Sequence, residues 1–250
     1  MTNVDAMEST KSTDLDVTKM LVSARLKLGR DPRTPSEVLA LLALDSKWPV
    51  REAVAQNPHT TTKTLDLLAR DSDLGVRTEC AKHKNMSAEM LWELGQTGSQ
   101  QIRENVAINK NTPSELLTEL SKDSREGVRE VVAYNANTTV DVLMKLSNDS
   151  SENVRDIVAY NPNTPRGVVL KLYQDKVQSD QITEEFAVAI VQRDVLDATE
   201  VAALVALYGD KVGRKVAELV PVRKGSALDK ILAKYGCIIK KRPSEWRGIG

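Results

Sequence analysis

The stretch DSREGVREVVAYNANTT, residues 123–139, returns 26 residues later as DSSENVRDIVAYNPNTP, residues 149–165. The two segments share an Asp, a Val-Arg pair, an Ala and an Asn at matching positions, and they differ mostly where side chains are expected to be exposed. Self-similarity at a fixed period of roughly 20 to 50 residues is typical of repeat proteins. The pair therefore predicts a chain built from stacked copies of one small unit.

The same period extends in both directions without an insertion. Turn segments begin at residues 31, 57, 83, 109, 135 and 161, with the sequences DPRTP, NPHTT, HKNMS, NKNTP, NANTT and NPNTP. Each turn after the first follows a segment related to VREAVA, and ARLKLG from residue 24 is a divergent first copy. We therefore predict six consecutive repeat units of 26 residues.

Each unit is predicted to form two short helices. The Thr of the turn, such as Thr34 or Thr112, is expected to cap the first helix, which then begins at Pro, and the Glu three residues after the Thr completes a capping box. Apolar residues three apart define the buried face of this helix. These pairs are Leu39 and Leu42, Leu65 and Leu68, Leu91 and Leu94, Leu117 and Leu120, Leu143 and Leu146, and Val169 and Leu172.

The second helix of each unit is expected to be the shorter one. It buries two apolar residues, Val50 and Val54 in one copy, and stops at the Asn or Pro of the next turn. An Asn at this point tolerates left-handed backbone and bonds local backbone groups, which suits a tight turn between helices. Helices this short are not stable in isolation, so the units must stack on one another.

The pattern D-x-x-x-x-VR-x-x-VA-x-N-P-x-T-P, followed by paired leucines, resembles the leucine-rich repeat variant, a family of right-handed superhelices related to HEAT repeats. The resemblance covers residues 24–175 and implies an all-α, right-handed α-solenoid built from α/3₁₀ pairs or from paired short helices. A known member of that family carries an iron-sulfur cluster in a cysteine-rich segment that this chain does not have, so no cofactor is implied. The family has no single activity to transfer.

The ends of the chain depart from the repeat. Residues 1–15 are predicted to be a flexible polar leader, and residues 16–175 to be the repeat solenoid. The register then fails, and residues 176–222 are expected to form a degenerate capping repeat, because a terminal unit needs one face that does not require a neighbour. Residues 223–250 are expected to begin as a helix and to end in a basic tail.

Composition argues against several classes of function. Aromatic residues make up only 4% of the chain, Cys80 and Cys237 are its only cysteines, and His59 and His83 have no ligand or catalytic partner at a suitable spacing. The sequence contains no Gly-rich phosphate loop and no nucleophile elbow. We therefore predict a protein that is not an enzyme and that holds no metal or cofactor. Without a secretory signal or a membrane-spanning apolar run, a cytoplasmic location is expected.

One Arg recurs in every unit. The column consists of Arg25, Arg51, Arg77, Arg103, Arg129 and Arg155. Arginines repeated along a solenoid can track a phosphate backbone. However, Asp45, Asp71, Asp123 and Asp149 each lie six residues before an Arg of the column, so the two groups can form a hydrogen-bonded ladder within or between units. We predict a structural ladder, with nucleic-acid binding as the alternative.

Repeat proteins bind partners through exposed positions that vary from unit to unit. Trp48, Tyr134 and Tyr160 are the candidate anchors, because buried aromatic side chains dominate interface energies. The alternative is that these rings only cover the seams between repeats. The function predicted on this basis is a protein-protein interaction module or adaptor.

The C-terminal segment carries a different candidate. From residue 210 onward the chain has 11 Lys and Arg and 4 Asp and Glu, a balance of +7, so the preceding part carries −7 within a net charge of zero. The basic residues Lys240, Lys241, Arg242 and Arg247 cluster with Trp246. This combination suits nucleic acid, an acidic partner surface or the acidic repeats of the same chain.

Overall fold

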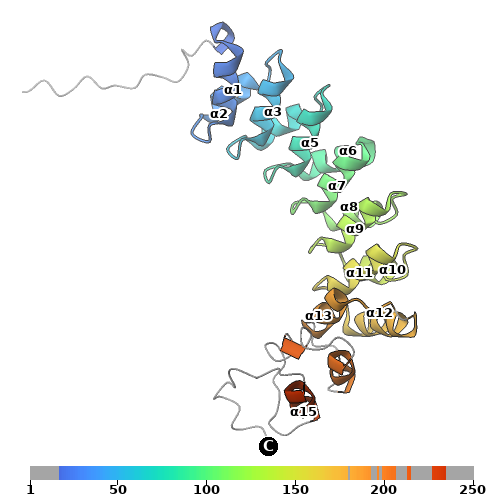
Figure 1. Cartoon of the computed structure of the whole chain (residues 1–250). Coiled ribbons are helices and arrows are strands. Elements are labelled where there is room, and N and C mark those ends of the chain that lie inside the picture. The colour runs from blue at the N-terminus through green and yellow to red at the C-terminus, as the bar shows by residue number, and fades with distance from the viewer. Residues whose placement is uncertain are drawn as a thin grey trace, which may run out of the picture. The chain divides into compact units, whose positions relative to one another are not determined.

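The computed structural model describes residues 17–179, 181–192, 196, 199–206, 213–214 and 227–234. The predicted leader and the basic tail lie outside these residues. Throughout the described part the regular structure is helical, with no β-strand (Figure 1). The chain divides into two compact units, between Leu116 and Leu117.

The first unit consists of two kinds of helix that alternate along the chain. A short 3₁₀-helix, η1, precedes them at Val17–Lys19. The longer helices are α1 (Val22–Arg30), α3 (Trp48–Gln56), α5 (Leu74–Lys82) and α7 (Gln100–Ile108). The helices between them, called the shorter helices below, are α2 (Ser36–Leu42) and α4 (Thr62–Leu68), with 7 residues each, and α6 (Ala88–Thr97), which is extended to 10 residues. Successive longer helices pack side by side, and each intervening helix packs against both of its sequence neighbours, which gives two layers (Figure 1).

The second unit continues the same alternation. Its helices are α9 (Glu126–Tyr134), α10 (Val140–Leu146), α11 (Glu152–Tyr160), α12 (Arg166–Ser179), α13 (Glu184–Gln192) and α15 (Ala227–Lys234), while α8 (Ser114–Leu120) contains the division point. Helix α9 packs against α11, and α11 also contacts α10, α12 and α13. The all-α repeat fold predicted from the sequence is confirmed, with pairs of short α-helices as its building block.

One detail of the predicted unit is wrong in most copies. The second helix is usually the longer one, as α2 has 7 residues and α3 has 9, and it is the shorter one only where α6 with 10 residues precedes α7 and α12 with 14 residues precedes α13. The Thr and Pro of the turn precede the first helix instead of starting it, which accounts for one residue of this difference. In addition, α12 has 14 residues and runs past Asp175, where the register of the repeat fails, to Ser179.

The core follows the predicted apolar columns. From α3 to α11 the two apolar positions of each longer helix are fully buried, as Val50 and Val54 show in α3, whereas Ala24 and Leu28 of α1 are half-buried. The paired leucines of the shorter helices are at most 5% exposed. Cys80 stands at the position of Val54 one repeat later and is also fully buried, and this burial strongly raises the pKa of its thiol. It is a small core residue, as predicted.

The turn Thr does not cap the following helix. The hydroxyl of Thr60 donates instead to the carbonyl of Val54, in the last turn of the preceding helix, at 2.6 Å. Thr34, Thr112, Thr138 and Thr164 make the same bond to the residue six positions earlier. The N-cap is the next residue: Thr61 accepts from the N–H of Thr64, whereas at Pro35 no side chain can do so. The predicted capping box is therefore wrong.

The turn Asn also acts differently from the prediction. Asn57 has φ −73° and ψ 122°, which is extended and not left-handed backbone. Its Nδ2 donates to the carbonyls of Gly29 at 2.8 Å and Asp31 at 2.9 Å in the preceding repeat, and its Oδ1 accepts from the N–H of His59. Helix ends leave such carbonyls without an intrahelical partner. The amide therefore satisfies the end of one repeat while it ties the next repeat to it.

We call this recurring contact the asparagine ladder. Asn109 donates to the carbonyls of Ala81 and His83, and Asn161 donates to those of Ala133 and Asn135. At the turn between those of Asn57 and Asn109, His83 stands in place of Asn. Its Nε2 lies 2.9 Å from the carbonyl oxygen of Asn57, and its Nδ1 accepts the N–H of Asn85, so the bonds require a neutral ring protonated at Nε2.

Candidate interaction surface

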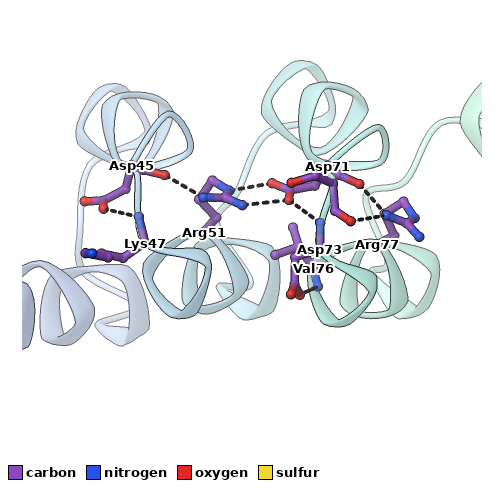
Figure 2. A network of polar contacts seen from close by, with 8 residues as sticks. Asp45, Lys47, Arg51, Asp71, Asp73, Val76 and Arg77 are labelled. Carbon is purple, nitrogen blue, oxygen red and sulfur yellow. Dashed lines mark hydrogen bonds and ion pairs between the residues drawn. The ribbon is translucent and has the colours of Figure 1, made fainter.

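Arg25, Arg51 and Arg129 of the column form the predicted ladder, and their ion pairs run between repeats, whereas Arg77 and Arg155 donate to backbone carbonyls of their own repeat. The Nε and Nη2 of Arg51 donate to Asp71, 20 residues later, at 2.5 and 2.8 Å (Figure 2). The Nη1 of the same side chain donates to the backbone carbonyl of Asp45, six residues earlier, at 2.7 Å. The Asp six residues before an Arg thus contributes its carbonyl, and the carboxylate comes from the next repeat.

The ion pair recurs in both units, and Arg129 also repeats the bond to the carbonyl six residues earlier, whereas Arg25 donates to the carbonyl of Met20, five residues earlier. Arg25 pairs with Asp45 in the first unit, and Arg129 pairs with Asp149 in the second. The Arg side chains of these pairs are only 12–15% exposed and the Asp side chains 7–8%. Guanidinium groups that are this buried and already bonded to carboxylates are poorly placed to contact phosphates. The geometry favours the structural interpretation of the column.

The ladder keeps its aspartates ionised. The hydrogen bond from Arg129 is the main cause that lowers the pKa of Asp149, with burial acting in the opposite direction. Burial is the largest influence on Asp71 and would raise its pKa, but the bonds from Arg51 and from the N–H of Asp73 outweigh it. The ladder is therefore a set of buried, charge-assisted hydrogen bonds that link neighbouring repeats.

The candidate anchor Trp48 is the first residue of α3, and its side chain is accessible. It is 49% exposed, and Leu74, at the equivalent position of α5, is exposed to the same extent. In these two repeats of the first unit, the first residue of the longer helix is therefore apolar and accessible. An exposed Trp with an exposed Leu at the next equivalent position is the kind of surface that anchors a partner.

The two tyrosines differ from each other. Tyr134 ends α9 and is 68% exposed, so most of its ring is available. Tyr160 ends α11, is 39% exposed, and has its ring centroid 5.9 Å from that of Phe186 in α13. Burial raises the pKa of its hydroxyl to about 12. Tyr160 thus covers a seam in part, whereas Tyr134 stays a candidate anchor.

The sequence prediction missed a charged cluster in the second unit. Lys176 of α12 is only 7% exposed, and its Nζ lies 2.6 Å from Glu152 Oε1 and 3.0 Å from Asp156 Oδ1 in α11. The same Nζ lies 5.0 Å from the centre of the Phe186 ring, within cation–π range. Lys176 lies one residue past the end of the predicted repeat, so the repeat alignment gave no signal for it.

The two carboxylates of this cluster are not equivalent. Glu152 makes a hydrogen bond with Lys176 that lowers its pKa. Asp156 lies within ion-pair distance of the same ammonium, but its Oδ1 makes no directed hydrogen bond, and burial raises its pKa. A cavity of about 50 Å³ lies beside the pair, lined also by Arg155 and Asp175. Its volume suits one or two waters instead of a substrate.

The remaining predictions concern the basic tail, metal binding and membrane-spanning helices. The basic-tail residues Lys240, Lys241, Arg242, Trp246 and Arg247 lie outside the described residues. Within the described ranges, no three His, Cys, Asp or Glu side chains are grouped so that they can hold a metal ion. No helix of the described part is long and apolar enough to cross a bilayer.

Comparison with known proteins finds similarity at the level of the fold. No protein-family model matches the sequence, and no curated protein sequence matches it. The fold is similar to a solved structure described as "a leucine-rich repeat variant with a novel repetitive protein structural motif", with a TM-score of 0.55 and 19% sequence identity. The match covers 86% of this chain and 94% of the other. The resemblance seen in the sequence is thus confirmed at the level of the fold.

Proposed function

We propose that the chain is a non-enzymatic protein-interaction module, an adaptor that acts in the cytoplasm through the surface of its helical repeats. A helical-repeat fold is in general a fold for binding proteins. The observation that carries the proposal is the contrast between constant and variable positions. The ladders and apolar columns recur from repeat to repeat, whereas the first residue of the longer helices changes between all but the last two of these repeats. These residues are Trp48, Leu74, Gln100, Glu126 and Glu152.

This pattern is expected if the repeats supply a rigid frame and the variable positions supply recognition. The exposed aromatic residues Trp48 and Tyr134 then act as anchors, because large rings that become buried in a complex contribute most of the binding energy. They stand on helices that are fixed by buried ladders. Anchors held on rigid elements lose little conformational entropy on binding.

The test is affinity capture from the native cell with the full chain and single variants. We expect Trp48→Ala or Tyr134→Ala to abolish capture of a partner that the wild type retains. Leu67→Ala is the matched control, because Leu67 is 51% exposed, close to the 49% of Trp48, but lies on the intervening helix α4 and not on one of the longer helices. Capture that is unchanged in both anchor variants, or lost equally in the control, would contradict the proposal.

A second candidate function rests on the basic C-terminal segment, with its balance of +7. Nucleic-acid binding through this segment predicts an affinity that falls steeply between about 50 and 200 mM salt, because phosphate contacts release counterions. The experiment measures binding to duplex and single-stranded DNA and RNA over that range. A Lys240→Ala, Lys241→Ala, Arg242→Ala variant is compared with the wild type. Micromolar binding at physiological salt that this variant loses would favour the second function over the first.

A further inference from the structure

The second unit shows within itself how a longer helix of this protein holds an ammonium group. Glu152 and Asp156 lie four residues apart on α11, so their side chains share one face of the helix. Together they bind the ammonium of Lys176 at 2.6 and 3.0 Å, with an aromatic ring, Phe186, on another side. This arrangement, two carboxylates one helical turn apart beside an aromatic ring, is called the lysine cradle below.

The preceding repeat carries the same carboxylates. Glu126 and Glu130 stand on α9 at the positions of Glu152 and Asp156 on α11, since both helices have 9 residues and the same place in the repeat. Glu126 is exposed and Glu130 is half-buried. Neither carboxylate makes a hydrogen bond or an ion pair with a residue of the described part. The carboxylates of a second cradle are therefore present and accessible.

Among the described residues, the carboxylates on α11 bind a lysine and those on α9 do not, because the helices that follow α11 and α9 differ in length. Lys176 reaches α11 because α12 has 14 residues, and it lies in the second half of that helix. The corresponding helix after α9 is α10, which has 7 residues and ends at Leu146. The residue 26 positions before Lys176 is Ser150, which is exposed and carries no charge. The chain thus fills one cradle with its own lysine and leaves the other without one.

The residues around this second cradle favour a cation. Tyr134 is four residues after Glu130 on α9, and its exposed ring can contact a cation through its face. The nearest cation of the ladder, Arg129, is already bonded to Asp149 at 2.7 Å. A carboxylate at the helix start, such as Glu126, also stabilises the helix dipole. That explanation does not extend to Glu130, which lies in the middle of the helix.

We propose that Glu126, Glu130 and Tyr134 form a docking site for an extended, lysine-rich segment of a protein partner. The proposal rests on the proposed function and names the chemistry of the partner. One lysine occupies the carboxylate pair in the way that Lys176 occupies its own cradle. The ring of Tyr134 lies about 9 Å further along the helix, at about 1.5 Å per residue. An extended peptide covers this distance in about three residues, so the preferred pattern is a basic residue at every third position.

The experiment uses the full chain and a fluorescein-labelled 12-residue peptide with Lys at every third position among Gly and Ser. Binding is followed by fluorescence anisotropy at about 50 and 150 mM salt. We expect Glu126→Gln/Glu130→Gln to weaken binding about five- to tenfold, since each exposed pair contributes up to about 1 kcal/mol. The same peptide with Gln in place of Lys should bind to neither protein.

The matched control removes two charges elsewhere. Glu115→Gln/Asp141→Asn changes exposed residues on the shorter helices α8 and α10 and lowers the net negative charge equally. An equal loss of binding in this control would overturn the proposal, because net charge and not the cradle would then explain it. Equal thermal melting curves show that the variants are folded, and a Glu126→Asp/Glu130→Asp variant, which keeps both charges, should retain most of the binding.

Two further results decide between occupants. If the peptide binds only after Lys240, Lys241 and Arg242 are replaced by Ala, the chain's own basic segment occupies the site and the proposal of a partner is overturned. A partner that is captured through Trp48 but is unaffected by Glu126→Gln/Glu130→Gln would also overturn this inference. That second result leaves the proposed function in place, so the failure of one is distinguishable from the failure of the other.

Discussion

The Nδ2 of Asn161 lies 2.6 Å from the carbonyl oxygen of Ala133, although 28 residues separate them in the chain. The same amide donates to the carbonyl of Asn135 at 3.0 Å, and its Oδ1 accepts the N–H of Asn163. One buried side chain therefore satisfies three backbone groups, two of which belong to the preceding repeat. A buried backbone group that loses its partner costs free energy comparable to a lost hydrogen bond.

This relationship predicts that the donor function of the amide is essential. Asn161→Ala should lower the free energy of unfolding by about 2–4 kcal/mol, because three backbone groups lose their partner. Asn161→Asp has nearly the same shape but should destabilise at least as much, since an ionised carboxylate donates nothing to the two carbonyls. Urea unfolding measures both variants. Asn153→Ala, at an exposed position of α11, is the control, and a mild effect of Asn161→Asp would contradict the prediction.

The Arg–Asp ladder leads to a prediction about stability. Arg129→Ala should lower the free energy of unfolding by about 3–5 kcal/mol, because it leaves the buried carboxylate of Asp149 without its partner. Arg125→Ala, at the exposed N-cap of the same helix, should change it by less than about 0.5 kcal/mol. Partner binding by the folded fraction should survive in both variants. Unchanged melting of Arg129→Ala combined with lost binding would assign Arg129 to a recognition surface.

His83 should make stability depend on pH. Burial lowers the pKa of this ring, so the unfolded chain takes up the proton more readily than the folded chain. The free energy of unfolding should therefore be highest above about pH 6.5, fall as the pH drops below the ordinary value of His, and level off below the folded pKa. His83→Asn should remove this dependence. It should also raise stability by about 1 kcal/mol, because an amide at this turn can make the second ladder bond.

The measurement for His83 is the urea midpoint at three pH values between about 5.5 and 7.5. His59→Asn is the matched control, since His59 is exposed and lies two residues after Asn57 in the previous turn. The wild type and this control should show the same slope with pH, and His83→Asn a smaller one. Parallel pH profiles for all three proteins would mean that His83 stays neutral for another reason or does not titrate in this range.

Asn105 is a buried polar residue at a position that is Ala53 in α3 and Val131 in α9. The residue is 8% exposed, and its Nδ2 has no hydrogen-bond partner among the residues that the structure describes. Asn105→Ala should therefore raise the free energy of unfolding by about 1 kcal/mol, because an unsatisfied buried donor is removed at little cost in volume. Thermal melting checks this, with Gln101→Ala on the exposed face of α7 as the control. A clear loss of stability would show that the amide has a partner in solution.

The sequence predicted the frame of the fold well because the frame is repeated. The 26-residue period, the leucine pairs and the Val50 and Val54 columns each appear several times, so a local ambiguity in one copy is resolved by the others. The Arg51–Asp71 pair was also within reach, since both residues recur at constant spacing. What failed was the interpretation of Thr34 and Asn57, whose side chains bond backbone groups in ways that a local capping rule does not contain.

The candidate site was less accessible to sequence reasoning for a related reason. Trp48, Tyr134 and Tyr160 were identifiable as aromatic residues, but the packing of Tyr160 on Phe186 depends on a helix that lies outside the repeat. The cradle around Lys176 depends on α12 being twice as long as α10, and no periodic signal marks that extension. Features that occur once in a repetitive chain have no second copy to confirm them.

The asparagine ladder also constrains how such a chain can change in length. Each amide meets carbonyls 26 and 28 residues earlier, so the gain or loss of one whole unit leaves every remaining turn with a correctly placed partner. A single-residue insertion within a unit instead places the amide opposite the wrong carbonyl and turns the next ladder arginine away from its aspartate. The ladder geometry therefore favours growth by duplication of whole units and disfavours small insertions and deletions. The gapless succession of turns from residue 31 to residue 161 agrees with this constraint.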